Sequence, residues 1–241
     1  MKVVILAGGL GRRLIPSTVV LPKPLMPVGN YPILEILIRT LKKHRLTDIT
    51  LAVGHLGNLI ETYFGKGEKL GVRISYNHEK KPLGTVGALS QIRGLDKTFM
   101  VMNGDLLTRL NFSKLISFHK KSGASTTIAT QMRKAKIDFG VIESKRRDQV
   151  TDYIEKPEMS YQVSMGVYMF EPSALKFIPR GKRLDFPELV KKLLKHKKKV
   201  AIYPCREFWL DIGRPEDYAR AVEVFPKIRK QLWNKNTSGG K

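Results

Sequence analysis

Apolar residues along this chain alternate between two patterns, short unbroken runs and spacings of three or four residues. An unbroken run bounded by glycine or proline predicts a buried strand, and the longer spacing predicts a helix with one apolar face. Residues 3–7 form the first run, and residues 31–41 form the first helical pattern, with Pro32 suited to its first turn. Strands and helices alternate in this way up to residue 119, which predicts a parallel sheet covered by helices on both faces.

The second half of the chain contains consecutive strands, which predict an antiparallel addition and therefore a mixed sheet. Strands are expected at residues 3–7, 49–53, 72–76, 99–102, 126–131, 139–143, 150–155, 163–170 and 200–203. Helices are expected at residues 31–41, 59–64, 85–92, 112–119, 185–194 and from 215 to about 224. The order of these elements indicates an α/β fold.

The length of 241 residues is enough for one α/β domain with a sizeable core. We expect a single domain over residues 1–225 and a basic C-terminal tail over residues 226–241 that is partly disordered. No apolar run approaches the ~20 residues of a membrane span, and Met1 leads almost directly into a strand, so we expect neither a membrane span nor a signal peptide. Cys205 is the only cysteine, which excludes an internal disulfide and fits a reducing, cytoplasmic setting.

The formal net charge of the chain is +23, and part of it lies in a lysine cluster over residues 191–199 and in the tail. One interpretation is a surface for nucleic acid or an anionic membrane, and the other is a solvated face. Aromatic residues make up 8% of the chain and none lies within the lysine cluster, which argues against a platform for stacked bases. We therefore favour the solvated face and expect no nucleic-acid partner, while the positive field would attract small phosphorylated ligands.

A glycine-rich loop, GGLG at residues 8–11, ends the first predicted strand, and Arg12 and Arg13 follow it directly. Glycines let a ligand approach the backbone closely and expose several N–H groups in a row. The two arginines and Lys23 add positive charge at the carboxyl end of a strand, where open α/β sheets bind ligands. The segment therefore predicts a polyphosphate site, although a glycine-rich turn with solvated arginines is the competing interpretation. Neither the GxxxxGK[ST] string of a P-loop nor the GxGxxG spacing of a dinucleotide fingerprint is present.

The segment GGLGRRLIPST, followed by PKPLMPVG, resembles the signature loop of the sugar-1-phosphate nucleotidylyltransferases, GGxGTRLxPxT…PKPLxPV. It departs from that pattern at Arg12, where the family usually has threonine. Six further blocks follow in the family's order, namely PLGTVGAL (82–89), NGD (103–105), FGVIE (139–143), IEKP (154–157), MGVYMFEP (165–172) and WLDIGRPEDY (209–218). The resemblance therefore extends over nearly the whole chain. It implies a Rossmann-like three-layer α/β/α sandwich with a mixed, mostly parallel central sheet, and mannose-, heptose- and glucosamine-1-phosphate guanylyltransferases are the members it suggests.

Asp105 and Asp211 are the candidate metal ligands. Asp105 follows the strand predicted at residues 99–102, and Asp211 lies in WLDIG (209–213), which also reads as a strand end; carboxylates at the carboxyl ends of strands face the ligand crevice of such sheets. Mg²⁺ is commonly held by one or two carboxylates together with substrate phosphates. Taken alone, each aspartate reads better as a helix cap or turn residue. The resemblance implies that both bind metal, and we therefore expect Mg²⁺ as the cofactor.

The resemblance also assigns basic residues to the phosphates. It implies that Arg13 contacts the departing pyrophosphate, Lys23 the nucleotide phosphates and Lys156 the phosphate of the incoming sugar phosphate. Without the resemblance, Lys23 and Lys156 would both be interpreted as surface lysines, although Lys23 lies between two prolines that stiffen its backbone. With Asp105 and Asp211 these three residues make up the expected catalytic set. The expected nucleotide-binding residues are Leu6, Ala7, Gly8, Gly9, Gly11, Arg12, Arg13, Lys23, Glu79, Gly84, Thr85, Asn103 and Gly104.

The expected sugar-phosphate contacts, again by resemblance, are Gly140, Glu155, Lys156, Ser164 and Gly166. The family commonly has asparagine at the position of Ser164, where it contacts sugar hydroxyl groups. Serine is shorter and reaches less far. We therefore hypothesise an acceptor other than plain glucose 1-phosphate, such as a modified hexose or heptose phosphate.

Glu79 precedes the segment that meets the nucleobase in the family. Members that use uridine or thymidine often carry glutamine there, because an amide both donates to and accepts from a pyrimidine edge. An ionised glutamate only accepts, which suits the two adjacent N–H donors of guanine. The alternative is a side chain that points to solvent beside Lys80 and Lys81.

Together these features predict a Mg²⁺-dependent enzyme that transfers a nucleoside monophosphate from an NTP to a sugar 1-phosphate, giving an NDP-sugar and pyrophosphate. GTP is the favoured donor, and CTP, UTP and dTTP are the alternatives. A non-catalytic paralogue that binds a nucleotide sugar is the rival class, against which the intact pair of aspartates and both lysines argue. A homo-oligomer is left open.

Overall fold

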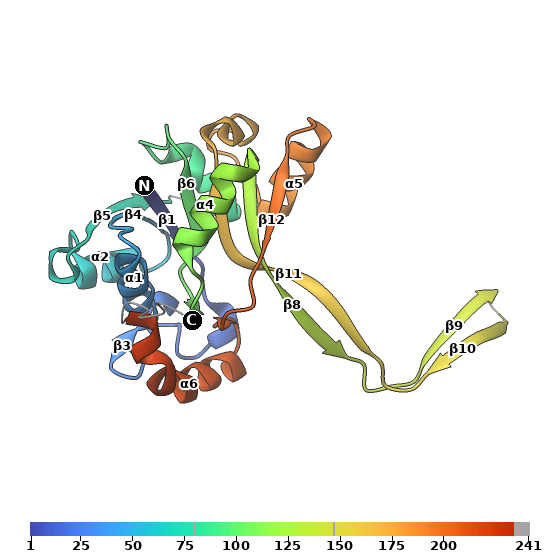
Figure 1. The fold of residues 1–241 in the computed structure, drawn as a ribbon. Coiled ribbons are helices and arrows are strands. Elements are labelled where there is room, and N and C mark those ends of the chain that lie inside the picture. The colour runs from blue at the N-terminus through green and yellow to red at the C-terminus, as the bar shows by residue number, and fades with distance from the viewer. Residues whose placement is uncertain (80, 147, 234–241) are drawn as a thin grey trace, which may run out of the picture.

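The chain folds around one mixed sheet, from which a long two-stranded ribbon projects (Figure 1). The computed structural model describes residues 1–79, 81–146 and 148–233. The helices are α1 (Ile33–Lys43), α2 (Gly57–Phe64), α3 (Gly84–Gly87), α4 (Phe112–Ser122), α5 (Phe186–Lys195) and α6 (Pro215–Trp233). The strands are β1 (Lys2–Ala7), β2 (Pro27–Val28), β3 (Tyr31–Pro32), β4 (Asp48–Val53), β5 (Arg73–His78), β6 (Phe99–Asn103), β7 (Leu106–Thr108), β8 (Thr126–Lys136), β9 (Val141–Arg146), β10 (Gln149–Ile154), β11 (Glu158–Phe170), β12 (Val200–Pro204) and β13 (Trp209–Asp211).

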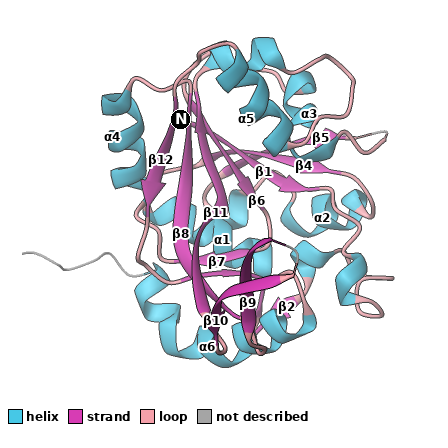
Figure 2. Cartoon of the chain, turned by 90° about the vertical axis from the view of Figure 1, so that its right-hand side faces the viewer, coloured by secondary structure: helices cyan, strands magenta, loops and turns pink. Residues whose placement is uncertain are grey.

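The central sheet has seven strands in the order β12-β8-β11-β6-β1-β4-β5. Strand β11 runs antiparallel to both of its neighbours, and every other neighbouring pair is parallel. The predicted mixed, mostly parallel sheet is therefore confirmed. Figure 2 shows these strands fanned across the molecule with the helices around them.

Strand β1 lies in the middle of the sheet and is buried on both faces, as its unbroken apolar run predicts. Val3 and Ile5 pack into one core with helices α1, α2 and α4. Val4 points to the opposite face and packs into a second core with α3 and α5. These two cores make the predicted three-layer α/β/α sandwich.

The parallel strands end at one edge of the sheet. Leu6 of β1 pairs with Asn103 of β6, and the Gly104 N–H donates to the Leu6 carbonyl oxygen at 2.9 Å. Strands β4 and β5 end beside them, at Val53 and His78. The loops that follow these four strands therefore open together, at the place where such sheets bind ligands.

The last helix extends further than predicted. Helix α6 does not end near residue 224 but continues through Pro226 to Trp233. Leu232 is buried, and the Trp233 ring packs edge-on against Tyr31 at 4.9 Å between centroids. The domain boundary expected at residue 225 therefore falls inside a packed helix, whose apolar residues the basic composition of the segment obscured. The part of the expected tail from 234 to 241 lies outside the described residues.

The four consecutive strands predicted after residue 125 also differ from expectation. Strands β8 and β11 are longer than predicted, while β9 and β10 pair only with each other and stay outside the central sheet. We call residues 132–163, which form the projecting ribbon in Figure 1, the arm. Within the part of the chain that the structure describes, no helix combines the length and the apolar character needed to span a bilayer.

Candidate active site

The glycine-rich loop after β1 forms one wall of a cavity of about 660 Å³ at the carboxyl edge of the sheet. The opposite wall comes from the segments that follow β4, β5 and β6. The cavity therefore lies where the sequence predicts a polyphosphate site.

Every residue expected to bind the nucleotide lines this cavity, together with one of the two aspartates. These residues are Leu6, Ala7, Gly8, Gly9, Gly11, Arg12, Arg13, Lys23, Glu79, Gly84, Thr85, Asn103, Gly104 and Asp105. They come from four separate segments of the sequence, which only the sheet brings together.

At two positions of the loop, the local geometry favours glycine over other residues. A Cβ atom on Gly8 would lie 3.2 Å from both Glu79 Oε1 and the Gly54 backbone nitrogen, so the walls of the cavity approach closely there. Gly11 adopts a left-handed φ of +62°, which glycine adopts at no steric cost. The Thr18 hydroxyl donates to the Gly11 carbonyl oxygen at 2.9 Å and holds this turn closed.

Asp105 and Asp211 are brought together by a short antiparallel ladder. Asp211, the last residue of β13, pairs with Leu106 of β7, and the Ile212 N–H donates to the Asp105 carbonyl oxygen at 3.0 Å. Burial and the neighbouring Asp105 carboxylate raise the pKa of Asp211 to about 6. Each aspartate has a buried Oδ1 atom with no hydrogen-bond donor. Buried carboxylate oxygens without donors are costly unless a cation compensates them.

Two cationic side chains face this pair. The Lys23 ammonium forms an ion pair with Asp105 Oδ2 and is largely buried there. A Cβ atom on Gly213 would lie 3.2 Å from both terminal nitrogens of Arg13, so that guanidinium lies against the backbone two residues after Asp211. The positive charges of Lys23 and Arg13 both oppose the rise in the Asp211 pKa. The site thus combines two carboxylates and two cations next to the glycine loop.

Glu79 lies in the cavity wall rather than in solvent. Its N–H donates to the Val53 carbonyl oxygen at 2.9 Å, and its Oε2 atom accepts the Leu83 N–H at 3.0 Å. Burial raises the pKa of the Glu79 carboxyl group, against the opposite effect of the Leu83 hydrogen bond. One carboxylate oxygen thus braces the loop, and the other lies near Gly8 at the cavity surface.

Ser164 and Gly166 lie where the arm leaves the sheet, close to Asn103. A Cβ atom on Gly166 would lie 2.6 Å from Asn103 Nδ2, and its φ is +69°. The Ser164 hydroxyl donates to the Tyr168 hydroxyl at 3.1 Å and accepts the Gly166 N–H at 3.3 Å. The serine is therefore engaged within its own strand.

Gly140, Glu155 and Lys156 lie on the arm, and they line the cavity no more than Ser164 and Gly166 do. Glu155 and Lys156 approach each other to 3.6 Å and are both more than half exposed. At Gly140 a Cβ atom would lie 2.1 Å from the Tyr153 hydroxyl, so a contact within the arm already accounts for this glycine. The residues expected to contact the sugar phosphate are thus divided between the base of the arm, where Gly166 lies beside Asn103, and the arm itself.

The chain matches the family model described as nucleotidyl transferase over residues 2–227. The chain belongs to the nucleotidyl transferase family. It is 33% identical to a UTP--glucose-1-phosphate uridylyltransferase from Synechocystis and 34% identical to mannose-1-phosphate guanyltransferase beta-A from Xenopus laevis, over 92% and 96% of its own length. It spans 62% and 66% of the lengths of these two relatives, so less than two thirds of each.

Among solved structures, this chain resembles HddC from Yersinia pseudotuberculosis, which has also been solved in complex with GMP-PN. The uncomplexed structure matches with a TM-score of 0.73 and 26% identity, over 93% of this chain and 99% of HddC. The fold and the family are therefore shown by likeness across nearly the whole chain.

Nine further residues, which were not expected from the sequence, line the cavity. They are Leu10, Leu14, Pro24, Gly54, His55, Lys81, Pro82, Asp185 and Gly213. Asp185 is the clearest case, since it begins α5 with a capping box and also accepts the Thr85 N–H at 3.0 Å. The sequence predicts the start of a helix at Asp185, but local patterns hold no signal that this start borders a cavity a hundred residues away in the chain.

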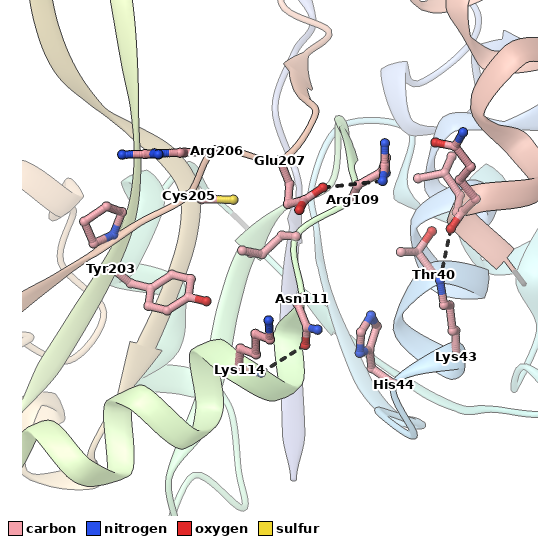
Figure 3. A pocket seen from close by; sticks show the side chains of 14 residues that line it. Thr40, Lys43, His44, Arg109, Asn111, Lys114, Tyr203, Cys205, Arg206 and Glu207 are labelled. Carbon is pink, nitrogen blue, oxygen red and sulfur yellow. Dashed lines mark hydrogen bonds and ion pairs between the residues drawn. The ribbon is translucent and has the colours of Figure 1, made fainter. Parts of the chain in front are cut away.

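A second cavity, of about 500 Å³, lies elsewhere on the molecule (Figure 3). It takes in Lys43, His44, Arg109, Lys114 and Arg206, which makes it strongly basic. Glu207 is the acidic residue of its lining and approaches Arg109 to 3.6 Å. None of the residues expected to bind substrate lines it, so the cavity beside the aspartate pair is the candidate active site.

Proposed function

We propose that this chain transfers a nucleoside monophosphate from an NTP, with GTP favoured, to a sugar 1-phosphate and releases pyrophosphate. The observation that carries the proposal is the pair of half-buried aspartates facing Lys23 and Arg13 at the end of a glycine-rich loop. Metal, triphosphate and attacking phosphate are all held by such groups in phosphoryl-transfer chemistry. The relatives that carry uridylyl- and guanylyltransferase names support the same reaction class.

The loop supplies the triphosphate site. Its backbone N–H groups and the guanidinium of Arg13 bind the phosphate oxygens of the NTP, and Lys23 adds a point charge between the phosphates and Asp105. Arg12 also lines the cavity and is exposed, which suits a contact at its outer end. These residues position the nucleotide and take no covalent part in the reaction.

Asp105 and Asp211 fit a divalent cation, because each has a buried oxygen without a donor and Asp211 is poorly solvated. The two carboxylates would hold Mg²⁺, with its remaining positions left to phosphates and water. When bound, the ion neutralises negative charge on the phosphates. The site offers two carboxylates rather than a complete set of protein ligands: among the described residues, no group of three or more Asp, Glu, His or Cys side chains is placed to hold a metal.

In the transfer, an oxygen of the sugar phosphate forms a bond to the α-phosphorus of the NTP, and the bond from that phosphorus to the bridging oxygen breaks. Pyrophosphate leaves with the electron pair. The attacking phosphate is already an anion, so no general base is required. The protein's contribution is to align the two substrates and to place positive charge, from Arg13 and Lys23, beside the leaving group.

Glu79 supports GTP as the donor. Its Oε1 atom lies at the cavity surface, and an ionised carboxylate accepts the two adjacent N–H groups of guanine. Its second oxygen, which already accepts the Leu83 N–H, has a further lone pair for this purpose. The guanyltransferase relative and the HddC complex with GMP-PN agree with this preference. CTP, UTP and dTTP are the alternatives.

Ser164 supports an acceptor other than glucose 1-phosphate. Its hydroxyl is short and is engaged by Tyr168 and Gly166, so it reaches less far than the asparagine that is usual at this position in the family. We propose a modified hexose or a heptose phosphate. The buried Cys205 fits the cytoplasmic setting expected for such a reaction.

A grid of ATP, CTP, GTP, UTP and dTTP against several sugar 1-phosphates tests this proposal, with pyrophosphate release as the readout. We expect release to require both substrates and Mg²⁺, with GTP as the best donor. Release that depends on the NTP alone, or no release with any pair, would contradict the proposed reaction.

A further inference from the structure

The end of α4 and the segment that follows α5 meet beside β12, the free edge strand of the central sheet. The Lys199 ammonium donates to the Ser122 carbonyl oxygen at 2.7 Å, and the Ser125 N–H donates to the Lys199 carbonyl oxygen at 2.9 Å. Figure 1 shows α5 at the top of the view and α6 at the opposite end. Segments that are distant in the sequence therefore form one continuous surface here.

Seven exposed lysines lie on this surface, which we call the lysine face. They are Lys120 and Lys121 of α4, Lys191 and Lys195 of α5, and Lys197, Lys198 and Lys199 before β12. None of them forms an ion pair with a described residue. Residues 112–125 and 189–206, from which they come, contain ten lysines and arginines and no aspartate or glutamate. Like charges gathered in this way repel one another, so the face is unfavourable unless external anions compensate it.

Two carboxylates on adjoining segments are engaged by other groups. Glu171 Oε1 accepts the Thr98 hydroxyl at 2.8 Å and lies 3.1 Å from His119 Nε2. Glu188 Oε2 accepts the Asp185 N–H at 2.8 Å, at the other end of α5. The charge of the lysine face is therefore presented to the surroundings of the molecule.

Protection of the sheet edge does not account for these lysines. Proteins place lysine on an edge strand to prevent its pairing with another chain. The sequence of β12 is VAIYP, which contains no charged residue. The seven lysines lie instead on two helices and on the connection before the strand.

Aliphatic side chains are exposed within and beside the lysine face. Leu194 is 57% exposed, and on α5 it lies one turn after Lys191 and next to Lys195. Ile202 of β12 is 48% exposed. It lies two residues after Val200, which packs into the core that includes α5, so both side chains point to the same side of the sheet. The surface thus combines unpaired cations with exposed apolar groups.

We propose that the lysine face docks on an anionic phospholipid membrane, with its ammonium groups at the lipid phosphates and Leu194 in the interface. Basic clusters are attracted to anionic lipids, and each lysine near the bilayer strengthens binding about fivefold. Aliphatic side chains among cations are typical of elements that lie in a membrane interface. The phosphates of a nucleic acid offer a leucine no apolar partner. The exposed aliphatic residues therefore favour a membrane over a nucleic acid.

This docking leaves the candidate active site open to the solution. Strand β11 is antiparallel to both β8 and β6, so β8 and its parallel neighbour β12 run in the same direction as β6 and β1. Lys121 and Lys199 precede the first residues of β8 and β12, whereas the cavity follows the last residues of β1 and β6. The two surfaces therefore lie at opposite edges of the sheet.

Co-sedimentation with vesicles tests the proposal and requires no catalysis. One set of vesicles contains phosphatidylcholine alone, and the other contains phosphatidylcholine mixed with phosphatidylglycerol. We expect the chain to sediment with the mixed vesicles only, and to be released as salt is raised, because salt screens surface charges. No sedimentation with the mixed vesicles at physiological ionic strength, or tighter binding to a competing duplex RNA, would overturn the proposal.

Two matched pairs of lysine substitutions locate the contact. Lys195→Gln with Lys198→Gln should weaken binding to the mixed vesicles about tenfold or more. Lys66→Gln with Lys69→Gln removes the same charge from exposed positions just before β5, at the other edge of the sheet, and should change binding less than about twofold. An equal loss in both double variants would show that net charge, and not the lysine face, determines binding, and would overturn the proposal.

Leu194→Ser tests the apolar part of the contact. It should weaken binding to the mixed vesicles by about fivefold, because the leucine no longer enters the interface. Leu59→Ser, at a 42% exposed position of α2 near the opposite edge of the sheet, is the control and should have no effect. An unchanged affinity in Leu194→Ser would overturn the choice of a membrane.

Acetylation of lysines by a water-soluble reagent shows the orientation of the unmodified chain. We expect mixed vesicles to protect Lys120, Lys195 and Lys198, and to leave Lys66 and the cavity residue Lys81 reactive. Mass spectrometry of the digested chain, with and without vesicles, measures the difference. Protection that is equal at all five positions, or absent from the first three, would overturn the proposal.

Discussion

Asp211 lies beside Asp105 because β13 and β7 form a ladder of three residues, in which Asp211 is opposite Leu106 and the Ile212 N–H donates to the Asp105 carbonyl oxygen. The two carboxylates are 106 positions apart in the sequence. One buried oxygen on each has no donor, and burial together with the neighbouring Asp105 carboxylate raises the pKa of Asp211 to about 6. This arrangement suits a cation and is unfavourable without one.

The aspartate pair leads to a prediction on turnover. Asp105→Asn and Asp211→Asn each remove one anionic ligand from the proposed Mg²⁺ site and should each lower kcat by about 10²-fold or more. Steady-state pyrophosphate release at saturating Mg²⁺ measures the effect, and circular dichroism checks the fold. Rates close to wild type in either variant would show that the carboxylates have another role.

The same pair predicts how stability depends on pH when metal is absent. The pKa of Asp211 is raised on folding, so the folded state binds more protons than the unfolded state between about pH 4 and pH 6. Stability from this group is therefore present below about pH 4 and lost as pH rises toward 6. In a chelator, Asp211→Asn should melt a few degrees higher than wild type at pH 7 and at about the same temperature near pH 4. A difference that does not change with pH would contradict the assigned cause.

Arg13 and Arg12 are neighbours with different expected effects. Both are exposed residues of the cavity lining, but it is the Arg13 guanidinium that lies against Gly213 beside the aspartate pair. Arg13→Ala should therefore raise the KM for the NTP and lower kcat/KM at least about tenfold more than Arg12→Ala, which serves as the control. Equal effects of the two substitutions would mean that charge alone, and not position, determines nucleotide binding.

Substitutions at Gly166 and Gly123 distinguish the effect of backbone strain from that of a steric clash with a neighbouring side chain. Both have a left-handed φ, +69° and +60°, but a Cβ atom would meet Asn103 Nδ2 at 2.6 Å only at Gly166. Gly123→Ala should cost about 1–2 kcal/mol of stability and leave activity unchanged. Gly166→Ala should cost more and should also lower activity, because Asn103 must move at the cavity edge. Denaturant unfolding and kcat/KM measured on both variants test this, and unaltered activity in Gly166→Ala would remove Asn103 from the site.

Glu79 predicts the base preference. Glu79→Gln keeps an oxygen for the Leu83 N–H but places an amide donor opposite guanine, so the preference for GTP over UTP should fall by about tenfold or more. Competition between the two nucleotides measures it, with Glu68→Gln, at an exposed site away from the cavity, as the control. A wild type that does not prefer GTP, or a preference unchanged by the substitution, would show that Glu79 only braces its loop.

Local patterns in the sequence predict most elements of the fold. The apolar run of β1 and the apolar face of α1 are each coded by adjacent residues, so their positions could be read directly. The end of α6 could not, because Leu232 and Trp233 are isolated in a basic segment and are buried only by contacts such as that with Tyr31. The direction of the arm could not be predicted either, because alternation along a strand does not show where its ladder leads.

The candidate site, like the fold, could be predicted only in part from local patterns in the sequence. The glycine loop is contiguous, and its chemistry is visible in GGLGRR. The pairing of Asp105 with Asp211 depends on two strands of three residues each, which are too short to show a pattern, and it was expected only from the family resemblance. Asp185 was missed because its closeness to Thr85 arises from the packing of α3 against α5.

The most direct test of the proposed reaction is a ³¹P NMR time course with GTP, a mixture of hexose and heptose 1-phosphates, and Mg²⁺. The account predicts that pyrophosphate and a nucleoside diphosphate ester appear in equal amounts, and that neither forms with Asp105→Asn or without the sugar phosphate. Release of orthophosphate instead, or consumption of GTP without a matching ester, would contradict nucleotidyl transfer as the activity of this chain.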